Sequence, residues 1–151
     1  MSEYSPKLPL RVYSADNTLI GEFGEERRNL TPINDIPQVM KNAVLAIEDA
    51  RFYQHGGVDY LGVIRAGLAN IGKLKSQGAS TITMQVARNV YLSSEKTYTR
   101  KLYEALLSFK IESSLSKDQI FELYINQIFL GQRAYGIAAA AQIYFGKAIK
   151  D

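Results

Sequence analysis

Apolar and polar positions along the chain predict a short β-hairpin followed by a series of helices. Residues 8–23 carry apolar side chains on both sides of a polar centre at Asp16 and Asn17, which is typical of a hairpin. Further along the chain, apolar residues recur at spacings of three and four, which indicates amphipathic helices. We therefore expect a mainly α-helical fold with a small N-terminal β-hairpin. The chain shows no internal repeat and no shift in composition, so residues 1–151 should form a single domain, with residues 1–35 as its hairpin and connector.

The first helix should begin at about Ile36 or Pro37, with Asp35 as its N-cap. Its apolar stripe is expected to consist of Val39, Ala43, Val44 and Ile47. The helix runs into EDARFYQHGG, residues 48–57, which holds two adjacent carboxylates, an arginine, two aromatic residues and the only histidine of the chain. Because partial desolvation at a helix edge can raise the pKa of a carboxylate, this cluster can be an acid/base site. A helix end whose charges are solvated or paired with Arg51 explains the same residues equally well.

Two further helical patterns follow this cluster. Residues 59–75 combine an apolar stripe with basic flanks, so this helix either packs on the core or lies at a membrane interface. The next helix begins near Ser80 or Thr81, both good N-caps, and places Thr81, Gln85 and Arg88 on one polar face. Backbone N–H groups, hydroxyls and an arginine at a helix N-terminus favour an anion, although an exposed amphipathic helix also carries a polar face.

Residues 98–114 form the next helical pattern. Arg100, Lys101 and Glu104 lie within one turn of it, and on an exposed helix such charge pairs contribute only about 0.2–0.5 kcal/mol each. The stripe that is expected to face the core consists of Leu102, Leu106 and Phe109.

The helix after it is expected to be central and buried. It opens with a capping box in SKDQ, residues 116–119, is apolar nearly all round and should stop at Gly131. On such a helix Glu122 and Asn126 need hydrogen-bond partners. A last, Ala-rich helix is expected near residues 134–145.

Composition narrows the choice of function without deciding it. The chain has 151 residues, 46% of them hydrophobic, and a formal charge of +3, which suits one globular core and an anionic ligand, an anionic membrane surface or nucleic acid. Without cysteine and with one histidine, thiolate and His-based metal sites are not expected. No apolar run approaches the ~18 residues of a membrane-spanning helix. The basic residues form no stripe and the ten tyrosines are spread through helical patterns, so nucleic-acid binding is not expected either.

Five stretches in order resemble the motifs of the peptidoglycan glycosyltransferase domain, glycosyltransferase family 51. They read EDARFYQHGG, GASTITMQVARN, RKLYE, KDQIFELYIN and YGIAAAAQIYFG. The resemblance extends from about Leu10 to Lys147 and is greatest to the 1A type of class A penicillin-binding proteins. It implies a lysozyme-like, mainly α-helical domain that polymerises lipid II into glycan strands and releases undecaprenyl diphosphate. Family members continue through further helices of the same domain, so we expect a C-terminally truncated domain.

The resemblance also implies a role for individual residues. Glu48 would be the general base that takes the proton from the 4-hydroxyl of the acceptor sugar, and Glu104 the second carboxylate, on the leaving-group side. The other matching positions would bind substrate or brace the site, and they are Asp49, Phe52, His55, Ser80, Thr81, Gln85, Arg88, Asn89, Arg100 and Lys101. A lipid-linked diphosphate already leaves easily, so cations and oriented donors matter more here than a strong acid. By analogy with direct displacement, we expect inversion at the anomeric carbon.

Two motifs depart from the family pattern. The second motif often has lysine where Arg88 stands, which keeps the charge but changes its geometry. The fifth motif commonly begins with Arg-Gly, whereas Gln132 and Arg133 stand here.

The expected partners follow from the same resemblance. They are lipid II, the growing glycan strand and a membrane surface contacted through residues 61–75, with a transpeptidase domain and cell-wall synthesis partners in the full-length protein. The location would be the periplasmic face of the bacterial inner membrane, and moenomycin the expected type of inhibitor. Assistance by a divalent cation (Mg²⁺ or Mn²⁺) at the diphosphate stays open. So does an alternative activity, because lysozyme-like muramidases and lytic transglycosylases also use two carboxylates, to cleave glycan.

Overall fold

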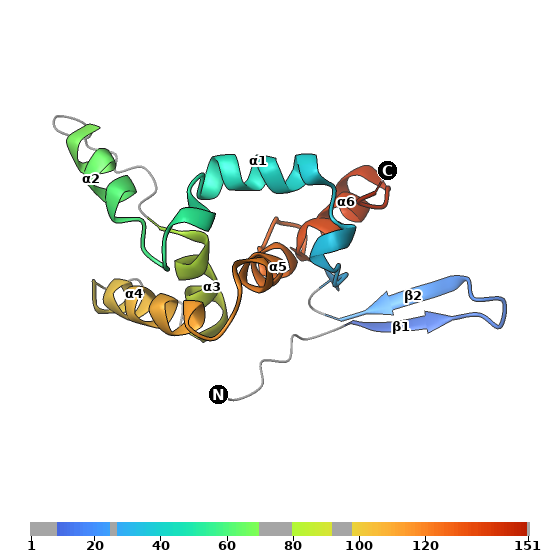
Figure 1. The fold of residues 1–151 in the computed structure, drawn as a ribbon. Coiled ribbons are helices and arrows are strands. Elements are labelled where there is room, and N and C mark those ends of the chain that lie inside the picture. The colour runs from blue at the N-terminus through green and yellow to red at the C-terminus, as the bar shows by residue number, and fades with distance from the viewer. Residues whose placement is uncertain (1–8, 25–26, 70–79, 92–97, 151) are drawn as a thin grey trace.

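The computed structural model describes residues 9–24, 27–69, 80–91 and 98–150. Its hairpin is formed by β1 (Leu10–Tyr13) and β2 (Leu19–Phe23), which pair antiparallel and project from the helical part of the molecule (Figure 1). The turn contains Asn17 at a φ of 67°, a left-handed conformation that asparagine tolerates well. The predicted hairpin is therefore confirmed.

The rest of the described chain is mainly helical, as predicted. The helices are α1 (Gln38–Glu48), α2 (Tyr60–Ala69), α3 (Ile82–Tyr91), α4 (Tyr98–Glu112), α5 (Lys117–Gln127) and α6 (Ile137–Phe145). Short 3₁₀ turns, η1 (Ile33–Asp35) and η2 (Phe52–Gln54), flank α1. Two short strands, β3 (Arg27–Arg28) and β4 (Ala134–Tyr135), pair in parallel, which the sequence pattern did not predict.

Helix α5 lies at the centre of the helical part, as predicted (Figure 1). Its residues Ile120, Phe121, Tyr124 and Ile125 are each at most 1% exposed. The capping box is present in full, because Ser116 accepts from the backbone N–H of Gln119 while the Gln119 side chain accepts from that of Ser116. The remaining core side chains are contributed by the connector, η2, α3 and α4, namely Ile36, Phe52, Ile82, Val86, Ala87 and Ile111.

The C-terminal boundary of α5 differs from the prediction. The helix ends at Gln127 rather than at Gly131, because the chain folds back on itself: the N–H of Gly136 donates to the carbonyl of Ile128 (2.8 Å). Residues 134 and 135 become β4 in this reversal, so the last helix begins at Ile137 rather than near residue 134.

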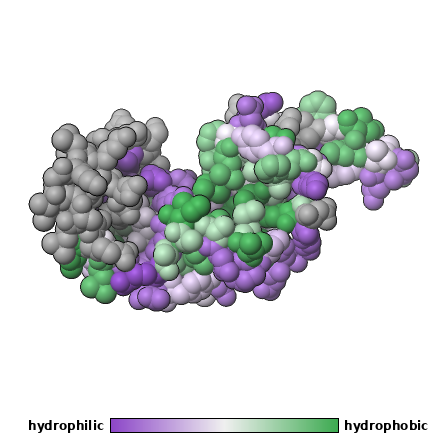
Figure 2. Space-filling model, turned by 90° about the horizontal axis from the view of Figure 1, so that it is seen from above, coloured by the Kyte–Doolittle hydropathy of each residue, from purple (hydrophilic) through white to green (hydrophobic). Residues whose placement is uncertain are grey.

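The start and the core-facing side of α1 also differ from the prediction. Asp35 is not the N-cap, because it ends η1; Ile36 is extended and 2% exposed, and Pro37 takes the cap position. Of the predicted stripe, Val39 and Ile47 are 76% and 81% exposed. The residues that pack against the core are Met40, Val44 and Leu45. Apolar residues occur nearly all round this helix, so the pattern alone does not select a face. Figure 2, seen from the side of α1, shows apolar residues gathered over the middle of this surface.

Helix α4 buries a different face from the one that the sequence predicted. Leu102, Leu106 and Phe109 are 62%, 55% and 40% exposed. Glu104 and Ser108 have no exposed surface instead, and Ile111 is 4% exposed. This polar face can be buried because the Glu104 carboxylate is ion-paired, and because the backbone of Gly57 packs closely on Ser108.

Helix α2 is described from Tyr60 to Ala69, and the predicted residues 70–75 lie outside the described part of the chain. Asp59 precedes this helix and accepts a hydrogen bond from the backbone N–H of Gly62 (2.9 Å), as an N-cap does. Leu61 and Ile64 are 60% and 58% exposed. These two side chains are therefore exposed rather than packed on the core.

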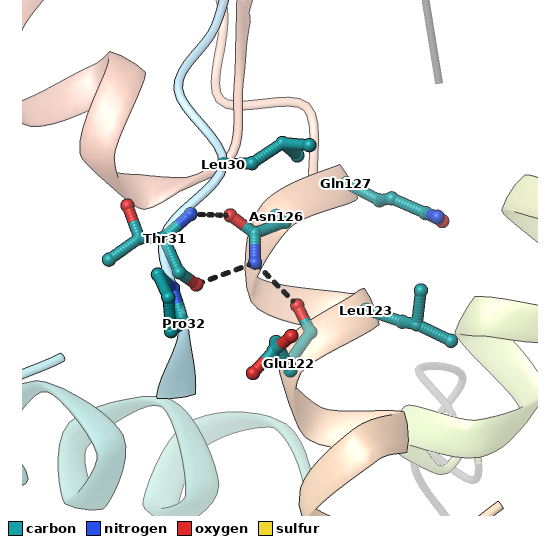
Figure 3. Close-up of a pocket in the computed structure, with 7 residues that line it drawn as sticks. All are labelled: Leu30, Thr31, Pro32, Glu122, Leu123, Asn126 and Gln127. Atoms are coloured by element: carbon teal, nitrogen blue, oxygen red, sulfur yellow. Dashed lines mark hydrogen bonds between the residues drawn. The ribbon is translucent and has the colours of Figure 1, made fainter. Parts of the chain in front are cut away.

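Glu122 and Asn126 have hydrogen-bond partners in the connector, and Figure 3 shows those of Asn126. The backbone N–H of Ile33 donates to Glu122 Oε2 (2.8 Å). Asn126 accepts from the N–H of Thr31 (2.8 Å) and donates to its carbonyl (2.9 Å). These bonds fasten the connector to α5 beside a pocket of about 290 Å³, which is also lined by Leu30, Pro32, Leu123 and Gln127.

Candidate active site

Glu48 is the last residue of α1 and is half-buried. The side-chain amide of Gln85, on α3, donates a hydrogen bond to Glu48 Oε2 (2.9 Å). The polar face predicted for α3 therefore meets the predicted general base. A carboxylate held by one amide and still reachable from solvent is suited to accepting a proton from a bound hydroxyl.

The adjacent carboxylate, Asp49, is buried and has different partners. It is 8% exposed, and its two oxygens each lie 3.0 Å from His55 Nε2. Asp49 Oδ2 also accepts the backbone N–H of Ile82, the first residue of α3 (3.1 Å). Arg51 pairs with Asp59 (3.4 Å) rather than with either carboxylate of the cluster. Asp49 and His55 therefore brace the end of α1 against the start of α3.

Phe52 and Thr81 belong to the same brace. Phe52 has no exposed surface and packs against Phe121 of α5, with ring centroids 5.9 Å apart. Thr81, the residue before α3, is 3% exposed; its hydroxyl donates to the carbonyl of Gly57 and accepts from the N–H of Met84. Thr81 is thus the N-cap, as predicted, and ties the loop after Glu48 to α3. The structure gives Phe52 and Thr81 a supporting position rather than one that faces a ligand.

Glu104 is the centre of a second charged group. Its carboxylate has no exposed surface, and its oxygens lie 3.1 Å from Arg100 Nε and 3.1 Å from Lys101 Nζ. Lys101 also hydrogen-bonds Ser80 Oγ, just before α3. The side chains of Arg100 and Lys101 are 19% and 46% exposed, so Lys101 in particular can reach a ligand while Glu104 holds it in place.

Sequence reasoning missed one residue near Glu48, Tyr124 of α5. Burial raises the pKa of its hydroxyl, the charge of Glu48 raises it further, and Arg88 of α3 acts in the opposite direction. Tyr124 therefore lies within electrostatic reach of both residues. In the sequence, the only indication of this residue is the hydroxyl group of Tyr124, which stands next to apolar residues of α5. Asn89, the remaining predicted residue, is exposed on α3.

Helix α3 brings these groups together. It packs against both α4 and α5, contacts Glu48 through Gln85, and begins two residues after Ser80, the partner of Lys101. Among the described residues, no three His, Asp or Glu side chains lie close enough to hold a metal ion. None of the described helices is long and apolar enough to cross a lipid bilayer.

Most enzymes that cleave glycosidic bonds use a pair of carboxylates, and this mainly helical domain holds one reachable carboxylate, Glu48, and one cation-paired carboxylate, Glu104. Comparison with known proteins specifies the family. The chain belongs to the transglycosylase family, whose profile, described as Transglycosylase, matches residues 16–151. At the level of the family, this is a peptidoglycan glycosyltransferase domain.

The relatives agree with this assignment. The chain is 64% identical to penicillin-binding protein 1A of Neisseria lactamica and 61% identical to that of Neisseria gonorrhoeae, in each case over the whole chain. It spans 19% of the length of these relatives. A crystal structure of penicillin-binding protein 1A from Haemophilus influenzae matches 97% of this chain and 12% of that one, with 27% identity and a TM-score of 0.34.

Proposed function

We propose that this chain polymerises lipid II into glycan strands, with Glu48 as the general base and undecaprenyl diphosphate as the leaving group. The observation that carries the proposal is the separation of two charged groups by α3. One is a half-buried carboxylate with a single amide partner, and the other is a pair of cations held by a buried carboxylate. A direct displacement needs a base on one side of the reacting sugar and charge stabilisation on the other.

In this mechanism Glu48 removes the proton of the acceptor 4-hydroxyl as the oxygen attacks the anomeric carbon of the donor. The bond from that carbon to the diphosphate breaks on the opposite face, which inverts the configuration from α to β. Arg100 and Lys101 stabilise the charge of the departing diphosphate through charge-assisted hydrogen bonds. Arg88, with its fork of donors, is placed on the same helix as Gln85 and adds to this stabilisation.

Glu104 acts through the cations in this proposal. Because its carboxylate has no exposed surface and both its oxygens face cations, it orients Arg100 and Lys101 rather than touching the substrate. The charged side chains assigned to the leaving group are cationic, so no step is assigned to a divalent ion.

The alternative activity is glycan cleavage, as in muramidases and lytic transglycosylases. That reaction needs a carboxylic acid open to the glycosidic oxygen. Glu104 does not have this position in the described structure, because it has no exposed surface and faces two cations, whereas Glu48 is reachable. The argument for synthesis is therefore the pair of cations, Arg100 and Lys101, which suits a departing diphosphate and has no use in cleavage of a glycosidic bond.

The test is incubation with labelled lipid II and, separately, with purified cell-wall glycan. We expect polymer from the first and no cleavage of the second; cleavage without polymer would contradict the proposal. Glu48→Gln should lower the polymerisation rate by at least about 100-fold, the usual contribution of a general base. Glu104→Gln should also lower it strongly. Asp35→Asn is the control, since it removes the charge of an exposed carboxylate that pairs with Lys150 (3.3 Å) and contacts none of these groups.

We also propose that α2 contacts the membrane that carries the lipid substrate, at the periplasmic face of the inner membrane. The exposed apolar side chains of Leu61 and Ile64 support this contact. Replacing both with serine should reduce flotation with anionic vesicles, while the same exchange at Val39, which is 76% exposed on α1, serves as the control. Equal flotation of the Leu61/Ile64 variant and the parent would argue against α2 as the contact.

A further inference from the structure

The hydroxyl group of Tyr124 is unusual for its surroundings. The residue is 1% exposed and lies in the core cluster of α5, yet its hydroxyl oxygen is fully buried and has no hydrogen-bond partner among the described residues. Buried polar groups are nearly always hydrogen-bonded, and a phenylalanine would fill the same space without an unsatisfied group. The hydroxyl therefore calls for a partner that the surrounding side chains do not supply directly.

Its position shows where that partner can be. Val44 of α1 packs against the same core cluster and precedes Glu48 by one helical turn, so Glu48 continues the face of α1 that covers this cluster. Glu48 and Arg88 both act electrostatically on the Tyr124 hydroxyl, from α1 and α3 respectively. In the described part of the chain, no other charged group contributes noticeably at this position. The buried hydroxyl and the face of α1 that ends in Glu48 therefore belong to the same side of the core cluster.

We propose that Tyr124 is a positioning residue for Glu48, its hydroxyl donating to the Glu48 carboxylate through one bridging water. The effect of Tyr124 on catalysis rests on the proposed function, whereas the bridge between Tyr124 and Glu48 does not. Gln85 holds the carboxylate from α3, and Tyr124 holds it from α5. Ordered water commonly satisfies buried groups that lack a protein partner, and such bridges are nearly as favourable as direct hydrogen bonds. Two donors fix the carboxylate so that a remaining lone pair faces the acceptor hydroxyl.

The first test is a double-mutant cycle in thermal unfolding with Tyr124→Phe and Glu48→Gln. We expect Tyr124→Phe to lower Tm by about 2–4 °C in the parent and by clearly less when Glu48 is already glutamine, because the two residues are coupled. Tyr144→Phe is the matched control, since the Tyr144 hydroxyl donates to the carbonyl of Leu130 (2.7 Å) and should show no coupling to Glu48. Additive effects of Tyr124→Phe and Glu48→Gln would overturn the proposal.

A second measurement does not depend on a variant of Tyr124. In protein labelled with ¹³C at the tyrosine Cζ, Glu48→Gln should shift the Tyr124 resonance and leave that of Tyr144 unchanged. An unchanged Tyr124 resonance would refute the bridge even if Tyr124→Phe did not fold.

Kinetics then connect the bridge to catalysis. Tyr124→Phe should lower kcat for lipid II polymerisation about tenfold with KM unchanged, and move the acidic limb of the pH–rate profile to higher pH, because a donor to the charged base has been lost. A structural role alone would leave the profile in place. If the parent protein makes no polymer while the cycle shows coupling, the proposed function fails and the geometric inference stands. If the parent makes polymer and the cycle shows no coupling, the Tyr124 bridge fails and the proposed function stands.

Discussion

The two adjacent carboxylates at the end of α1 should respond in opposite ways to the loss of their charge. Glu48 is half-buried with one amide partner, whereas Asp49 is 8% exposed and joins His55 to the start of α3. We therefore expect Glu48→Gln to abolish polymerisation with little change in stability. Asp49→Asn should mainly destabilise the fold.

The size of the Asp49 effect follows from its contacts. Asp49 accepts from His55 Nε2 (3.0 Å) and from the N–H of Ile82 (3.1 Å), and an asparagine in its place keeps one acceptor oxygen. The loss of one hydrogen bond to a charged group costs about 1.5–3 kcal/mol. Removing a negative charge from the N-terminus of α3 costs about 0.3–1 kcal/mol more. The sum, about 2–4 kcal/mol, corresponds to a fall in Tm of about 4–16 °C for a chain of this size.

Thermal unfolding of the two variants beside the parent measures this difference. Glu48→Gln should cost no more than about 1 kcal/mol, since the glutamine oxygen still accepts from Gln85 and only the coupling to Tyr124 is lost. If Asp49→Asn unfolds at the parent temperature, or if both variants unfold equally early, Asp49 does not brace α1 against α3. Circular dichroism at 222 nm is sufficient, because the described chain is mainly helical.

Two further predictions concern the same part of the fold. Gly57 has a φ of +93°, and an added Cβ would lie 2.8 Å from Ser108 Oγ. Gly57→Ala should therefore lower the free energy of unfolding by about 1–3 kcal/mol in chemical denaturation. Its neighbour Gly56 has nothing within 4 Å of an added Cβ, so Gly56→Ala should change it by no more than about 0.5 kcal/mol. Equal effects would contradict the close approach of this loop to α4. Burial and the neighbouring Asp118 raise the pKa of the Tyr53 hydroxyl to about 12, above its ordinary value of about 10. The unfolded chain therefore loses this proton at lower pH than the folded chain, and the free energy of unfolding falls as the pH rises from about 10 to about 12. Tyr53→Phe should make that fall less steep, and an unchanged slope would rule out the contribution of Tyr53.

The helices could be predicted from the sequence better than the faces that they bury. The capping box at Ser116 and the cap at Thr81 located two helix starts, because these residues supply specific hydrogen bonds to backbone N–H groups. In α1, apolar residues lie nearly all round, so the choice between Val39 and Met40 as core residue depends on how α1 meets the core cluster. That contact joins residues far apart in sequence, and local periodicity does not contain it.

The candidate site was predictable from motif order rather than from physical pattern. Hydropathy placed Glu104 on an exposed face, whereas the structure buries it completely. Burial of this carboxylate is possible because Arg100 and Lys101 lie on the same helix and turn toward it. Tyr124 was missed because an apolar helix with one tyrosine looks like any core helix until the surroundings of its hydroxyl are known.

Helix α3 contacts both Glu48 and the cation group of α4. Its first N–H binds Asp49, its Gln85 binds Glu48, and the residue two before it, Ser80, binds Lys101. A fourth contact, from the Thr83 hydroxyl to Glu112 Oε1 (2.6 Å), fixes its position along α4. Glu48 and the cations are therefore not independent features, because a displacement of α3 moves both. The buried Asp49–His55 pair holds the start of α3, so in the proposed reaction it would act on both groups without facing the substrate.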